Sequence, residues 1–175
     1  MKILCITGAM SGVGKTTLGE KLLSRLHNWA ACKVTACIGG ERHRCPRGKG
    51  TECGVCSSLK ENYVIEDSRE IIEEEGSDTA RLKTAGAQKV LWIKAKPRYI
   101  GHALQEGLQA LSPYNGVLFE GNHALKYLNP DLAVMIRSQN NRVKRSAREV
   151  LEKVDMFVDC DFDGAVVEKI IEVVE

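Results

Sequence analysis

A run of small residues followed by a lysine and two threonines, GAMSGVGKTTL at residues 8–18, has the clearest chemistry in the sequence. It follows the short apolar run 3–7 and precedes leucines at helical spacing, so it joins a predicted strand to a predicted helix. The motif G-x-x-x-x-G-K-[ST] fits here, with Ala9 in place of its first glycine. Inward-facing N–H groups, a helix start, a lysine and a hydroxyl bind a polyphosphate and its Mg²⁺. The predicted nucleotide-binding residues are Gly12, Val13, Gly14, Lys15, Thr16 and Thr17.

Two of these loop residues and two acidic residues elsewhere in the sequence are the candidates for the chemistry. Lys15 would face the outer phosphates and Thr16 would bind Mg²⁺. Glu120 ends the apolar run GVLF, where a carboxylate could hold Mg²⁺ or its water; the alternative is a surface glutamate at a strand end. Asp78 is a second candidate for the Mg²⁺ and γ-phosphate region, and the competing interpretation is a helix N-cap formed by Ser77 or Asp78.

A second group of candidate ligands lies in the irregular, cysteine-rich insert at about residues 39–59. Two thiolates separated by two residues can grip one tetrahedral metal ion, and nearby arginines would favour their charged form. The alternatives are structural zinc, which we prefer, an iron–sulfur cluster, a redox or metal-delivery pair, and free thiols. The candidate metal ligands are Cys45, Cys53 and Cys56, completed by His43 or Cys37.

The elements that must position these residues alternate between strand and helix. Strands are expected at 3–7, 33–38, 89–95, 116–121, 131–136 and 156–160, and helices at 17–26, 68–75, 78–87, 98–111, 146–154 and 165–174. This alternation predicts an α/β fold of the P-loop NTPase class, a mostly parallel sheet with helices on both faces. Ligands of such a sheet gather at the carboxyl ends of its strands. We expect one domain over residues 1–175.

Composition excludes several classes of partner. Lysine and arginine total 25 against 23 aspartate and glutamate, so the net charge calls for neither nucleic acid nor an acidic membrane. No apolar run approaches the ~20 residues of a membrane span, and the chain start is too short for a signal peptide. We therefore expect a cytoplasmic protein, in which cysteines are thiols or metal ligands. Cys5 and Cys160, both within predicted strands, are interpreted as small buried hydrophobic residues.

The segments MKILCITGAMSGVGKTTLGEKLL, GSDTARLKTAGAQKV and GVLFEGN resemble the molybdopterin-guanine dinucleotide biosynthesis protein B family. That family groups with dethiobiotin synthetase and the nickel-insertion GTPases. The resemblance implies GTP binding, phosphate and Mg²⁺ roles for Lys15 and Thr16, and matches for Asp78 and for Glu120-Gly121. Met10 stands where the dimeric ATPases of this class carry a signature lysine, which disfavours the chromosome-partitioning branch.

The choice of base rests on that resemblance, so the cofactors are Mg²⁺ and GTP or ATP. The nearest match to a guanine-reading motif, EKVD at 152–155, precedes a strand instead of following one. Asn140 and Asn141 follow the strand 131–136 and carry amides able to read a base edge, although loop solvation explains them equally well. The basic residues around them could face an anionic substrate or form a solvated face. They are Arg137, Arg142, Lys144, Arg145 and Arg148.

Three functions fit these patterns. The first is a slow GTPase with an accessory role in molybdenum cofactor biosynthesis. The second is a metallochaperone GTPase that carries metal on its cysteines, and the third is a small-molecule kinase. A metal-sensing module that binds nucleotide without turnover is the non-enzymatic alternative. The partners that these hypotheses admit are the nucleoside triphosphate, a cofactor-assembly protein and a second copy of the chain.

Overall fold

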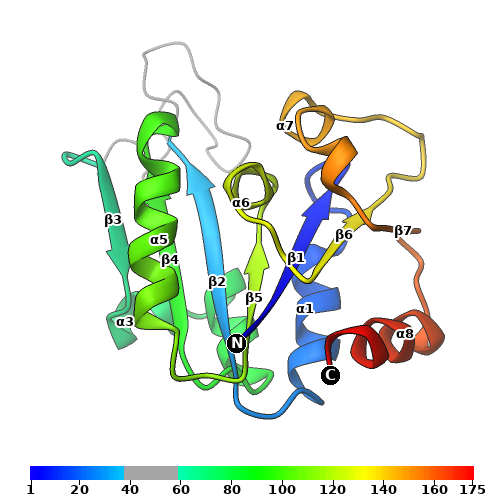
Figure 1. Cartoon of the computed structure of the whole chain (residues 1–175), viewed down its shortest axis with the longest axis horizontal. Coiled ribbons are helices and arrows are strands. Elements are labelled where there is room, and N and C mark those ends of the chain that lie inside the picture. The colour runs from blue at the N-terminus through cyan, green and yellow to red at the C-terminus, as the bar shows by residue number, and fades with distance from the viewer. Residues whose placement is uncertain (38–58) are drawn as a thin grey trace.

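The described residues form a central seven-stranded sheet, whose strands lie in the order β3-β4-β2-β5-β1-β6-β7. The computed structural model describes residues 1–37 and 59–175. All strand pairs are parallel except β3 with β4, which is antiparallel. In Figure 1 the arrowheads of β1, β2 and β5 reach the same edge of the sheet, while β3 points the other way. The strands are β1 (Lys2–Gly8), β2 (Trp29–Ala36), β3 (Tyr63–Glu66), β4 (Val90–Ala95), β5 (Gly116–Glu120), β6 (Leu132–Ile136) and β7 (Met156–Val158).

Helices cover both faces of the sheet, as the alternation of elements predicts. A buried apolar cluster lies on each face of the sheet. One cluster packs the sheet against α1, α3, α4 and α8, and the other packs it against α5, α6 and α7. Figure 1 shows α5 and α6 on the near face. The helices are α1 (Lys15–Leu23), α3 (Arg69–Ile72), α4 (Asp78–Thr84), α5 (Ile100–Ala110), α6 (Asn122–Tyr127), α7 (Arg145–Arg148) and α8 (Gly164–Val174), with 3-10 turns at Pro97–Tyr99 and Leu151–Lys153. The α/β fold with a mostly parallel sheet is confirmed.

The interior strands β1, β5 and β6, which each have a strand on either side, are buried on both faces of the sheet. Every residue of β5 and β6 is buried, and β1 is buried from Leu4 onward. This explains why their sequences are nearly continuous apolar runs without alternation. Burial raises the pKa of the Cys5 thiol to about 12, so it stays protonated and packs as a small apolar side chain, as predicted.

Several predicted boundaries are wrong, each for a local reason. The second strand starts at Trp29, not at 33, because Trp29 to Ala31 pack into the sheet although alanine favours helices. β3 and α6 are too short to produce a clear period and were not predicted. The predicted helix 146–154 is split into α7 and a 3-10 turn. The last strand ends at Val158, so Cys160 lies beyond it and is only partly buried.

Candidate functional site

The loop between β1 and α1 has the backbone of a phosphate-binding loop. Gly12 and Gly14 have positive φ angles of 75° and 98°, which glycine adopts without strain. A Cβ at Gly8 would lie 2.7 Å from the Val13 side chain, so a larger residue would push the loop open. Lys15 is the first residue of α1 and is half-buried. The loop therefore presents its backbone and Lys15 at a helix start, in the order that phosphate binding requires.

Thr16 and Glu120 meet at the carboxyl end of β5. The Thr16 hydroxyl donates a hydrogen bond to Glu120 Oε2 at 3.0 Å, and both residues are buried, 8% and 5% exposed. Glu120 is thus no surface glutamate. A hydroxyl and a carboxylate are hard oxygen donors of the kind that Mg²⁺ prefers, so this pair fits a Mg²⁺ site.

The two residues after Glu120 fasten β5 to the phosphate loop. Gly121 has a φ of 142°, and a Cβ there would lie 2.7 Å from the Val34 carbonyl oxygen. Asn122 is buried; its Oδ1 accepts from Gly8 N–H and its Nδ2 donates to Gly8 C=O, both at 3.0 Å. Asn122 therefore fixes the start of the loop relative to Glu120.

Asp78 lies at the start of α4 and forms an ion pair with Lys33 of β2. The helix cap is Ser77, whose hydroxyl accepts from Ala80 N–H at 3.0 Å, so Asp78 itself is not the capping residue. The Lys33 side chain is 5% exposed, and Lys33 is the register partner of Glu120 on the neighbouring strand. Asp78 thus lies at the sheet edge where Glu120 ends, with its charge balanced by a buried ammonium. Its role toward Mg²⁺ stays a prediction.

Arg81 ties α4 to the helix that follows the phosphate loop. Its guanidinium donates to both carboxylate oxygens of Glu20, at 2.8 and 2.5 Å, and to the Thr17 hydroxyl at 3.2 Å. This two-point contact is the geometry in which arginine and carboxylate bind most specifically. Thr17 therefore lies against Arg81, and the contact sets the position of Asp78 relative to α1.

On the other side of the loop, a segment from β6 is attached to Ala9 at both of its ends. Ala9 N–H donates to Ile136 C=O at 2.8 Å, and Ala9 C=O accepts from Lys144 N–H at 2.9 Å. Asn140 Oδ1 accepts from Arg142 N–H at 3.2 Å, so that atom serves the turn, while Asn141 lines the cavity next to Met10. The two asparagines thus have different environments: Asn140 is bonded within the turn, and Asn141 is among the residues that line the cavity.

The sequence EKVD does not reach this region. Asp155 Oδ2 accepts from Ala133 N–H at 2.8 Å, near the amino end of β6. That is the edge of the sheet opposite the phosphate loop, so Asp155 does not read a base there.

Cys45, Cys53, Cys56 and His43 lie outside the described residues. Cys37 is described and is 3% exposed; its N–H donates to Ala95 C=O at 2.8 Å. Within residues 1–37 and 59–175, no group of three or more histidine, cysteine or acidic side chains is arranged to hold a metal. In the same residues, no helix has the length and apolar character to cross a membrane.

Sequence reasoning missed two residues of the site. Lys33 could have been noticed as a lysine within the strand sequence WAACKVTA, since a strand buried on both faces excludes an unpaired charge. Asn122 follows Glu120 and Gly121 in the segment GVLFEGN. An amide directly after a strand-end acid and a glycine is a signal that a backbone contact follows.

The phosphate loop, the buried Thr16–Glu120 pair and the mostly parallel sheet together define the fold of a P-loop NTPase. No protein family model matches the chain, and no curated protein sequence matches it significantly. Among solved structures it is similar to the MinC:MinD cell division protein complex of Aquifex aeolicus, at a TM-score of 0.44 and 15% identity, over 99% of this chain and 78% of that chain.

Proposed function

We propose that the protein binds a nucleoside triphosphate with Mg²⁺ at the phosphate loop and hydrolyses it slowly. The observation that carries this proposal is the 3.0 Å hydrogen bond between Thr16 and Glu120. It brings the Mg²⁺-binding position of the loop motif into contact with a strand-end carboxylate, although the two residues are far apart in sequence. A glycine-rich turn without a ligand would not require that buried pair.

The roles of the side chains follow from their positions. Lys15 would bind the outer phosphates, and Thr16, with Glu120 directly or through a water molecule, would hold Mg²⁺, which neutralises phosphate charge when bound. The carboxylate of Glu120 also orients the Thr16 hydroxyl through their hydrogen bond. Asn122 keeps Gly8 in place, so the loop does not need to reorganise when the phosphates arrive.

GTP is the preferred nucleotide in this proposal, and assembly of a metal cofactor, the molybdenum cofactor, is the process served. Both rest on the resemblance of the loop, of GSDTARLKTAGAQKV and of GVLFEGN to the molybdopterin-guanine dinucleotide biosynthesis protein B family. A cofactor-assembly protein is the partner that this role requires. The metallochaperone variant rests on cysteines outside the described residues, and zinc or an iron–sulfur cluster there remains a prediction.

The test is a comparison of GTP and ATP in binding and in phosphate release, with and without Mg²⁺. We expect tighter binding and faster release with GTP, both dependent on Mg²⁺. Equal binding of the two nucleotides would remove the GTP preference. Absence of binding to either nucleotide would overturn the proposal as a whole.

A small-molecule kinase is the second candidate, and a cavity favours it. About 350 Å³ of space is lined by Lys33, Ser77, Asp78 and Trp92, among others, on the side of β2 next to Glu120. An acceptor held there would lie beside the outer phosphates. Product analysis separates the two functions, because hydrolysis releases inorganic phosphate while a kinase leaves it on an acceptor.

A further inference from the structure

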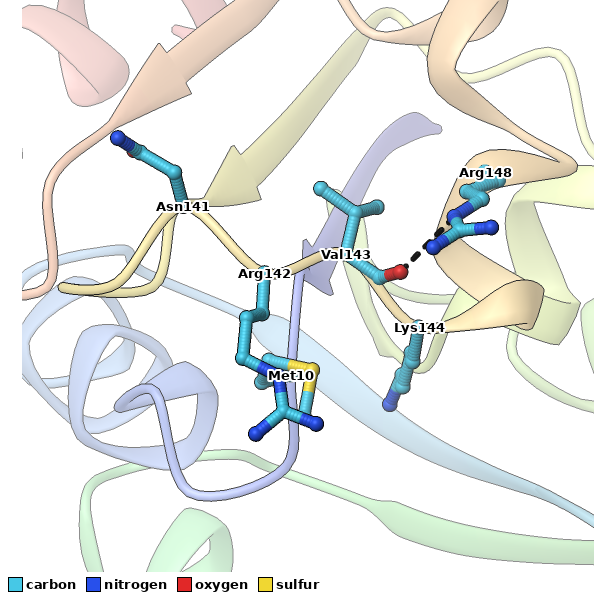
Figure 2. Close-up of a pocket in the computed structure, with 6 residues that line it drawn as sticks. All are labelled: Met10, Asn141, Arg142, Val143, Lys144 and Arg148. Atoms are coloured by element: carbon cyan, nitrogen blue, oxygen red, sulfur yellow. Dashed lines mark hydrogen bonds between the residues drawn. The ribbon is translucent and has the colours of Figure 1, made fainter.

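A cavity beside the phosphate loop has cationic walls. It measures about 460 Å³ and is lined by Met10, Asn141, Arg142, Val143, Lys144 and Arg148. Three of these side chains are basic and none is acidic. Figure 2 shows the Arg142 and Lys144 side chains leaving the same side of their segment, with Arg148 on the other side of Lys144.

The cations of this cavity differ from the other basic residues nearby. Arg137 pairs with Asp159 at 3.5 Å and Arg145 pairs with Glu149 at 3.2 Å. Among the described residues, no carboxylate forms a salt bridge with any of the three cavity cations. Arg148 instead donates from Nε to the Val143 carbonyl oxygen at 3.0 Å, the contact dashed in Figure 2. The basic run thus separates into two neutralised residues and three cations around one hollow.

The cavity is joined to the phosphate loop by backbone contacts. Because Ala9 binds Ile136 and Lys144 at once, the segment between them begins and ends on the loop itself. Lys144 is half-buried at that junction. Burial, and next the charge of Lys15, lower the pKa of Lys144 to about 8, while Glu120 opposes the shift. An ammonium held near another lysine in this way is stabilised when an anion arrives.

We propose that this cavity is an anion subsite beside the phosphate loop, which binds a phosphate group through Lys144 and Arg142. The proposal rests on nucleotide binding at the phosphate loop. The phosphate has two possible sources: the terminal phosphate of the triphosphate, or a phosphate of a second substrate. Both sources supply the same chemistry: a compact dianion that pairs with the positive charges of Arg142 and Lys144.

The variants are Lys144→Ala and Arg142→Ala, and the matched control is Arg145→Ala. Arg145 lies in the same segment, but its side chain is 94% exposed and does not line the cavity. Calorimetry measures binding of GDP and of a non-hydrolysable GTP analogue in Mg²⁺. Inorganic phosphate is then titrated onto the nucleotide-free protein and onto the protein saturated with each nucleotide.

If the terminal phosphate occupies the subsite, each cavity variant weakens the triphosphate about tenfold or more and leaves GDP unchanged. If a phosphate of a second substrate occupies the subsite, the cavity variants bind both nucleotides as tightly as the wild type does. Inorganic phosphate then binds the protein saturated with the triphosphate analogue and loses about tenfold in the cavity variants. Arg145→Ala should change neither result.

The proposal is overturned if neither cavity variant alters triphosphate or phosphate binding, or if Arg145→Ala alters them equally. Failure of nucleotide binding in the wild type would be a separate result. The phosphate titration of the nucleotide-free protein would still test the cavity, because loss of phosphate binding in the variants supports the subsite and its persistence contradicts it.

Discussion

The two sides of the phosphate loop differ in how their charged groups are paired. On the side of β2 and β5, charged and polar groups are matched with one another: Thr16 with Glu120, and Lys33 with Asp78. On the side of β6 and α7, Arg142, Lys144 and Arg148 surround a cavity in which no described acid pairs with them.

This difference assigns different ligands to the two sides. Oxygen donors that are already hydrogen-bonded can exchange one contact for a metal ion at small reorganisation cost. Cations near one another become more stable only when an anion joins them. We therefore interpret the β5 side as the Mg²⁺ side and the β6 side as an anion side, with Lys15 between them.

Lys15 gives the largest expected effect, because the proposed roles of both sides depend on the phosphates that Lys15 is proposed to bind. Lys15→Ala should abolish turnover and weaken triphosphate binding well beyond tenfold, since a charge-assisted contact contributes ~1.5–3 kcal/mol. Calorimetry and a phosphate-release assay measure these effects, with Lys169→Ala on the exposed surface of α8 as the control. Unchanged triphosphate affinity in Lys15→Ala would remove the phosphate-loop assignment.

Lys33 tests whether the matched side depends on its buried ion pair. Lys33→Met keeps most of the volume but leaves Asp78 without this ammonium, and we expect a loss of about 2–3 kcal/mol in the free energy of unfolding. The value lies below that for a fully buried pair because the Asp78 side chain is 25% exposed. Urea unfolding measures it, and adding Asp78→Asn should recover part of the loss. A single variant as stable as the wild type would show that the pair contributes little.

Asn122 tests how rigidly the two sides are joined. Asn122→Ala leaves the buried N–H and C=O of Gly8 without their partners, which should cost ~1–3 kcal/mol of stability and weaken nucleotide binding. Thermal unfolding and calorimetry measure the two losses, and Asn129→Ala, at an exposed position, is the control. If stability falls but affinity is unchanged, Asn122 supports the fold alone.

Much of the Mg²⁺ side could be predicted from the sequence, since the loop motif and the acid after GVLF each have a fixed relation to one strand. The contacts of Asn122 and Lys33 could not, because they join residues more than one element apart and depend on strand order. The separation of the five basic residues into salt-bridged ones and cavity-lining ones likewise depends in part on the fold. The sequence shows five cations and the local pair of Arg145 with Glu149, four residues on, but only the fold shows that Arg137 has Asp159 beside it.

The smallest expected effect is a change in bound protons on the anion side. The pKa of Lys144, lowered to about 8 chiefly by burial, should rise when a phosphate binds beside it. If the terminal phosphate is the group that binds there, triphosphate binding at about pH 9 should take up as much as about one proton, and much less near pH 7, where Lys144 is already charged. Calorimetry in buffers of different ionisation enthalpy measures the uptake. Lys144→Arg, which stays charged, should abolish it, and an unchanged uptake in that variant would assign the proton to another group.

The most direct test of the account is the Mg²⁺ dependence of GTP binding and turnover in the wild type and in Glu120→Gln. The amide keeps the shape of the side chain and its acceptor for the Thr16 hydroxyl, but it removes the charge. We predict that Mg²⁺-free binding is nearly the same in the two proteins, while the gain in affinity on adding Mg²⁺ and the turnover both fall strongly in the variant. Full turnover and an undiminished Mg²⁺ effect in Glu120→Gln would contradict the assignment of the β5 side to Mg²⁺.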